Sequence, residues 1–184
     1  MSTINLNDAK YEVSSVKVFN GGVAGIVKNC KIRVERKKAD DAENAPKYKV
    51  ILTDGAGAEI NKGYFANFEK STPKALDFFV KEMKHLANMF EVKLPEAVES
   101  YDALLDATMA GCRTNMEGKL VNVGVSYGTT DYPKRYLEIA SAFAITPITE
   151  TPYLGVKALM VRPEPTPLTE QPSAPAGPGN ELPW

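Results

Sequence analysis

Basic and aromatic residues are interleaved along those stretches of this 184-residue sequence that are typical of β-strands. Such a surface suits a single nucleic-acid strand, because cations can follow its phosphates while aromatic rings stack on unpaired bases. Stacking contributes on the order of 1–3 kcal/mol per base whatever the base is, so binding would tolerate many sequences. The residues that we expect to contact a strand are Lys31, Arg33, Arg36, Lys47, Tyr48, Lys49, Lys62, Tyr64, Phe65, Tyr127, Lys134 and Arg135.

These residues also have a plainer interpretation. Phe65 and other aromatic side chains could belong to the core, and the lysines could be ordinary surface charges. Three of the 23 acidic residues follow Arg162, so residues 1–162 hold 22 basic and 20 acidic side chains, a net charge of only +2. A surplus this small does not by itself point to a polyanionic partner. Both interpretations stay open, and Tyr132 and Tyr136 belong to the same pattern.

Residue types that support nucleophilic or zinc-dependent catalysis are scarce. His85 is the only histidine, and it falls within an expected helix. Cys30 and Cys112 are the only cysteines and lack the spacing of metal ligands, so we expect both to be reduced and buried. These observations favour a protein that is not an enzyme and that uses neither a metal nor a cofactor.

Two further motifs are better explained by turns. The glycine-rich residues 20–25 lie between strands, and no helix follows them to offer its N-terminus to a phosphate. Asp40, Asp41 and Glu43 lie in a loop that is rich in alanine and in charges of both signs. We therefore expect a solvated hairpin tip there rather than a cation site.

The spacing of apolar residues predicts the elements that must position these side chains. Period-two alternation and β-branched residues predict strands, and spacings of three and four predict two amphipathic helices. The first helix follows Thr72 and Pro73, a cap residue and a proline at the first helical position, and the second extends from Pro95 to a C-cap at Gly111. The expected strands are residues 11–19, 23–36, 47–53, 58–68, 119–127 and 134–145, with a final apolar run at 153–162.

This order of elements predicts a mainly β protein of the α+β class. Three strands, a helical insertion and then two or three strands is the order of an OB-fold, an antiparallel five-stranded barrel. The helical pair is long for the position between strands 3 and 4. A separate helical subdomain packed on a sheet is therefore the alternative.

The composition changes near Arg162, which predicts a boundary between a body at residues 1–162 and a tail at residues 163–184. The tail carries three charged side chains, all acidic, and seven of the 13 prolines. It can bury too little apolar surface to offset the entropy of ordering, so we expect it to be disordered. The only tryptophan is the last residue, where it could fill an apolar pocket of a partner protein while nearby carboxylates meet basic side chains.

The last four residues are Glu181, Leu182, Pro183 and Trp184. This ending resembles the C-terminal tip of bacterial and phage single-stranded DNA-binding proteins, in which several acidic residues precede an aliphatic residue, a proline and an aromatic residue. Here one acidic residue precedes Leu182. The start INLNDAKYEVSSVKVFNGG and the strand KNCKIRVERKKAD look like phage members of that family. The resemblance implies an OB-like body that binds single-stranded DNA and a tip that recruits replication or recombination proteins.

Our leading hypothesis is therefore sequence-tolerant binding and protection of single-stranded DNA in replication or recombination, by a phage-encoded protein in the cytoplasm. No stretch approaches the ~18 consecutive apolar residues of a membrane span, so no membrane partner is expected. The alternative is a virion structural or assembly protein that docks through its tail, and a magnesium-dependent nuclease is the least favoured hypothesis. Whether the chain forms a homo-oligomer stays open.

Overall fold

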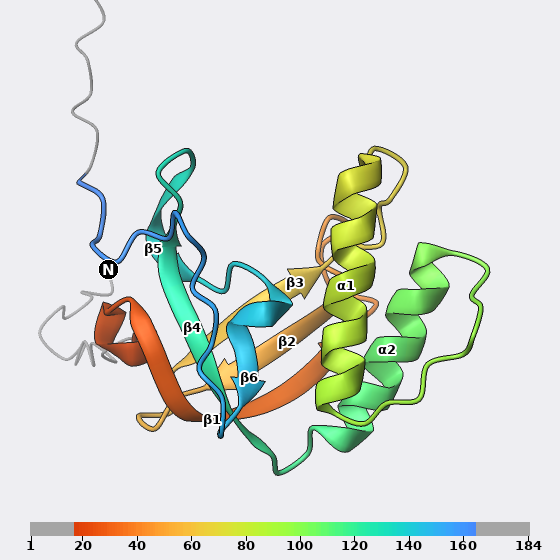
Figure 1. The fold of residues 1–184 in the computed structure, drawn as a ribbon, viewed down its shortest axis with the longest axis horizontal. Helices are drawn as coiled ribbons and strands as arrows, with labels where there is room; N and C mark the ends of the chain where they lie inside the picture. Colours follow the sequence, from red (N-terminus) through yellow and green to blue (C-terminus); the bar gives the residue numbers. More distant parts are fainter. Residues whose placement is uncertain (1–16, 165–184) are drawn as a thin grey trace, which may run out of the picture.

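The computed structural model describes residues 17–164, which form an antiparallel sheet with two helices against one side of it (Figure 1). The helices and two short 3-10 turns are α1 (Pro73–Met89), α2 (Tyr101–Asn115), η2 (Phe19–Gly22) and η3 (Ala142–Ala144). The strands are β1 (Gly25–Arg36), β2 (Tyr48–Thr53), β3 (Glu59–Tyr64), β4 (Leu120–Gly128), β5 (Pro133–Glu138) and β6 (Ile145–Pro147). The expected sheet and the helical insertion between β3 and β4 are confirmed.

The strands follow the order β3-β2-β1-β4-β5, and β6 pairs with the first half of β4. Every ladder is antiparallel. The strands β3 and β5 stand at the two ends of this order and form no ladder with each other in the described part of the chain. The sheet is therefore open here, and a closed barrel is not observed.

Alternation along β1 divides the sheet into two faces, because successive side chains of a strand point to opposite sides. Ile32 and Val34 are buried toward the helices, whereas Lys31 and Glu35 are exposed on the outer face. The core between sheet and helices includes the fully buried Met83, Leu86, Leu105, Met109, Val50 and Val123.

Both cysteines are free and buried, as expected. Burial raises the pKa of the Cys30 thiol to about 11, with a further contribution from the charge of Asp54. Burial alone raises the pKa of Cys112 to about 12. Both thiols are therefore protonated at neutral pH and pack as small apolar side chains.

The first helix begins as predicted and the second does not. Thr72 caps α1 by accepting a hydrogen bond from the backbone N–H of Ala75 at 3.3 Å. The second helix begins at Tyr101 rather than at Pro95, because Ser100 supplies the cap by accepting a hydrogen bond from Ala103 N–H at 3.1 Å. The start expected at Pro95 therefore lies about 1.7 turns before the observed start of this helix.

The predicted C-cap at Gly111 is wrong. This glycine lies inside α2, and a Cβ atom there would stand 2.3 Å from Cγ1 of Val92. Its missing side chain lets the segment that follows α1 approach α2 closely, so its function is packing rather than helix termination.

Four expected strands differ from the structure. The strand expected at residues 58–68 is β3 and ends at Tyr64. Residues 17–18 have no regular structure and Phe19 begins η2, while residues 11–16 lie outside the described range. Residues 134–145, expected as one strand, are divided among β5, η3 and β6. Residues 153–162 form a single bridge, Thr129 with Ala158, instead of a strand.

The chain after β6 nevertheless covers the outer side of β4 (Figure 1). A Cβ atom on Gly124 would stand 2.6 Å from Cδ2 of Leu154. Tyr127 N–H donates to the carbonyl of Leu159 at 3.0 Å, and Leu159 N–H donates to the carbonyl of Gly128 at 2.9 Å. The outer face of β1–β3 is not covered in this way and carries the exposed Lys31 and Glu35.

The predicted tail lies outside the described residues from position 165 onward, and so does its tip at residues 181–184. Neither helix in residues 17–164 has the length and apolar character needed to cross a membrane.

Candidate nucleic-acid interface

The outer face of β1–β3 holds three of the predicted contact residues, Lys31, Arg33 and Lys49. Arg33 donates to both carboxylate oxygens of Glu59, at 2.7 and 3.1 Å, and also contacts Glu35 at 3.1 Å. The hydrogen bonds to Glu59 raise the pKa of Arg33, and the same pair lowers the pKa of Glu59. Glu59 and Glu35 therefore neutralise the charge of Arg33 on this face. Lys31 and Lys49 form no ion pair with any other residue of 17–164.

Lys47 and Tyr48 connect β2 to α2. The Lys47 ammonium lies 2.7 Å from Asp102 Oδ1 and 3.0 Å from Asp106 Oδ2, and the Tyr48 hydroxyl donates to Asp106 Oδ1 at 2.9 Å. Burial lowers the pKa of Lys47, but the two carboxylates outweigh burial and raise it. Tyr48 is 5% exposed, and Arg36 stands over its ring with 5.9 Å from Cζ to the centroid. Lys47 and Tyr48 therefore hold the sheet on the helix.

Lys62 and Tyr64 lie on the inner face of β3. The Lys62 ammonium is 3.5 Å from the buried carboxylate of Glu82, which accepts a hydrogen bond from Ala142 N–H at 2.6 Å. Tyr64 is 5% exposed, and burial raises the pKa of its hydroxyl well above the usual value. This pair therefore joins β3 to α1 and η3.

Tyr127 is 6% exposed, and its hydroxyl donates to the carbonyl of Gly22. Like Tyr48 and Tyr64, it presents no open ring face to the solvent in this structure. A base can stack only on a ring that it can reach, so we leave these three tyrosines out of the candidate interface.

The β4–β5 hairpin presents the most exposed aromatic and basic side chains together, and its turn projects beyond the rest of the sheet (Figure 1). Tyr132 is 78% exposed and Tyr136 is 79% exposed. Between them lie the exposed Lys134 and Arg135. Of these two, only Lys134 has an ion-pair partner within residues 17–164, Glu138 at 3.8 Å. Both tyrosines belong to the basic and aromatic sequence pattern but are not among the expected contact residues. Their position in the sequence on either side of Lys134 and Arg135 could have indicated that they are contact residues.

A basic groove of about 560 Å³ lies beside this hairpin, between β5, η2 and the first residues of β3. Its lining includes Lys17, Arg135 and Arg162 together with the ring of Tyr136. Among residues 17–164, Glu59 is the only acidic residue in the lining, and Arg33 already binds it. The basic groove therefore combines a surplus of positive charge with an open aromatic ring.

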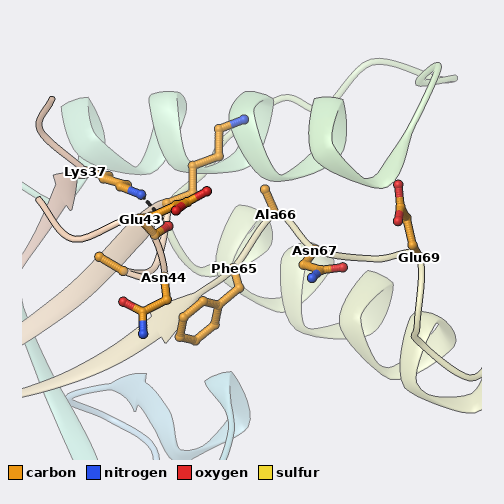
Figure 2. A pocket seen from close by; sticks show the side chains of 9 residues that line it. Lys37, Glu43, Asn44, Phe65, Ala66, Asn67 and Glu69 are labelled. Atoms are coloured by element: carbon orange, nitrogen blue, oxygen red, sulfur yellow. Dashed lines mark hydrogen bonds between the residues drawn. The ribbon is translucent and has the colours of Figure 1, made fainter.

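A second concave surface lies at the other end of β3. Loop 37–47 and the residues after Tyr64 enclose a pocket of about 800 Å³, which we call the loop pocket (Figure 2). Phe65 lies in its wall and is 54% exposed, so this predicted contact residue keeps an accessible ring. Lys37 and Lys47 contribute basic groups to the wall, and Glu43 and Glu69 contribute acidic ones.

His85 on α1 packs against the segment that contains η3 and β6. Its Nε2 lies 2.9 Å from the carbonyl oxygen of Ile145, and its ring packs at 5.1 Å from that of Phe143. Within residues 17–164, no three His, Cys, Asp or Glu side chains are placed so that they could hold a metal ion.

Comparison of the chain with protein-family models, curated proteins and solved structures found no match.

Proposed function

We propose that this protein binds single-stranded DNA with little sequence preference, and that the β4–β5 hairpin and the basic groove form its main contact surface. The observation that carries the proposal is the run of exposed side chains from Tyr132 to Tyr136, which encloses Lys134 and Arg135. Two open rings can stack on bases while the cations contact phosphates. A duplex keeps its base faces stacked, so this surface favours a single strand.

The strand order supports the same proposal. In an OB-fold, the second and third strands and the loops after the first and fourth strands bind oligonucleotides. The corresponding segments here are β2, β3, loop 37–47 and the hairpin turn at residues 129–132. We propose an OB-like body in which the basic groove lies between β3 and β5, the two end strands that do not pair with each other.

We further propose that the protein coats and protects single strands during replication or recombination. The proposal of DNA rather than RNA depends on the resemblance of residues 181–184 to the tip of single-stranded DNA-binding proteins. The same tip would recruit a replication or recombination partner, with Leu182 and Trp184 as apolar anchors.

The direct test is a fluorescence anisotropy titration of the full chain with dye-labelled oligo-dT and with a duplex of equal length. We expect tighter binding to the single strand and an affinity that falls between about 50 and about 200 mM salt, because bound cations release counterions from the phosphates. Equal affinity for both forms, or none for either at low salt, would refute the proposal.

Matched tyrosine variants locate the contact surface. Tyr132→Ala and Tyr136→Ala should each weaken oligo-dT binding by ~1–3 kcal/mol, because each removes one stacking ring. Tyr153→Ala is the control, since Tyr153 is also exposed, at 57%, but lies in the segment after β6. If all three variants bind like the wild type, the hairpin is not the contact surface.

A further inference from the structure

The loop pocket lies too far along β3 to be part of the basic groove. Glu59 and Ile60, the first residues of β3, line the groove, whereas Phe65 follows the last residue of β3 and lines the pocket. Four residues of β3 lie between Ile60 and Phe65, and the five steps from Ile60 to Phe65 span about 17 Å at 3.3–3.4 Å each. A ligand that contacts both places must therefore be extended.

Phe65 differs from the aromatic residues that follow it in the chain. Phe68, Phe79 and Tyr101 pack on one another, with ring centroids 4.9 to 6.4 Å apart. Phe65 takes part in no aromatic pair within the described residues, and more than half of its surface is open. Its ring is available as a stacking platform inside a concave site.

The walls of the loop pocket are fixed by contacts that do not use Phe65. Lys37 N–H donates to the carbonyl of Lys47 at 2.9 Å, and the Lys37 ammonium donates to the carbonyl of Glu43 at 2.7 Å. Pro46 packs on β3 so closely that a Cβ atom on Gly63 would stand 3.0 Å from it. Lys47 is held in turn by two carboxylates of α2. The loop is therefore held in place before any ligand binds, which lowers the entropic cost of binding.

The polar lining fits a base better than a phosphate. Asn44 and Asn67 line the pocket, and neither side-chain amide has a hydrogen-bond partner among residues 17–164. An amide both donates and accepts, so it can pair with the edge of any base. Glu43 and Glu69 offset the charges of Lys37 and Lys47 on the same wall, and Lys47 is already paired with two carboxylates of α2, so the wall attracts a phosphate only weakly.

We propose that the loop pocket takes one nucleobase of the bound strand, stacked on Phe65 with its edge facing the amides of Asn44 and Asn67, while the phosphates stay outside. This inference rests on the proposed single-strand binding and adds a second anchor to it. The strand then follows β3 from the basic groove to the loop pocket.

The test compares full-chain variants in the oligo-dT titration. Phe65→Ala should weaken binding about 5- to 150-fold, the equivalent of one lost stacking contact. Phe65→Tyr keeps the ring and should bind like the wild type. Phe78→Ala is the matched control, because Phe78 is also exposed, at 45%, but lies on α1 outside the loop pocket and the basic groove. Melting curves verify that each variant is folded.

Two results separate this inference from the proposed function. If the wild type binds no oligo-dT, the proposed function itself fails. If the wild type binds and Tyr136→Ala weakens binding while Phe65→Ala does not, single-strand binding stands and the base pocket is refuted. Joint replacement of Asn44 and Asn67 by Ala should also weaken binding, and wild-type affinity in that variant would refute the role of the amides.

Discussion

Arg33 on β1 reaches across β2 and donates two parallel hydrogen bonds to the carboxylate of Glu59 on β3, at 2.7 and 3.1 Å. Thr53 lies opposite Glu59 on β2, and its hydroxyl oxygen is 3.5 Å from Arg33 Nη1 and 3.4 Å from Glu59 Oε1. The ion pair thus neutralises one cation of this face, and its acidic member also lines the basic groove.

Glu59→Gln should raise the affinity for single-stranded DNA. The substitution removes the one negative charge that residues 17–164 contribute to the basic groove, and it frees Arg33 from one of its two carboxylate partners. The gain should be largest at low salt, where screening is weak. Glu35→Gln is the control, because Glu35 also pairs with Arg33 but does not line the basic groove. A loss of affinity in Glu59→Gln would contradict the placement of the interface.

Lys47 and Lys49 should respond differently to substitution by Met. Lys47→Met should lower stability by about 1 kcal/mol, because it breaks a partly exposed network with Asp102 and Asp106. Lys49→Met should leave the melting temperature unchanged and reduce the salt dependence of DNA binding, because Lys49 makes no ion pair in residues 17–164. The opposite assignment of the two effects would show that Lys47 is the DNA contact.

Asp54 should make stability sensitive to acid. Burial alone would raise the pKa of its carboxyl, but N–H donors of Asn20, Ala56 and Ala58, at 2.8 to 2.9 Å, outweigh burial and lower the pKa. The folded pKa thus lies below the unfolded value near 3.8. The stabilisation is then complete above that pH and is lost as the pH falls through the folded pKa.

Melting curves from about pH 7 to about pH 3 test this prediction. Asp54→Asn should flatten the acid-side decline relative to the wild type, because an amide does not titrate there. Asp54→Ala should cost about 2 kcal/mol at neutral pH, because three backbone donors lose their acceptor. An unchanged acid response in Asp54→Asn would assign the decline to other carboxylates.

Removal of residues 165–184 should leave the melting temperature almost unchanged, because their composition is too rich in proline and too poor in apolar residues to support a core. DNA affinity should hold or rise at low salt, since the deletion removes negative charge. Removal of Pro183 and Trp184 alone should abolish capture of a replication partner in a pull-down and leave DNA binding intact. Two results would refute a partner-binding tail: unfolding of the body in a truncated chain, or capture of the same proteins by the full and truncated chains.

Local pattern alone predicted much of the sheet and the first helix. The alternation around Ile32 and Val34 and the cap at Thr72 depend on neighbours within a few residues, so their effect can be recognised in the sequence. The burial of Tyr48 also had a local signal, because it shares a period-two face with Val50 and Leu52. Because an aromatic ring can also stack on a base, Tyr48 was expected to contact DNA instead.

The tertiary structure determines which charged side chains are free to contact a nucleic acid. Lys47 meets Asp102 across 55 positions of the chain, and Lys62 lies near the carbonyl of Ala140 across 78 positions. No spacing rule relates such residues, because their side chains come together only when α2 and η3 pack against the sheet. The sequence by itself therefore determined which residues can bind a phosphate or stack on a base, and the packing of distant elements decided which of them remain free to do so.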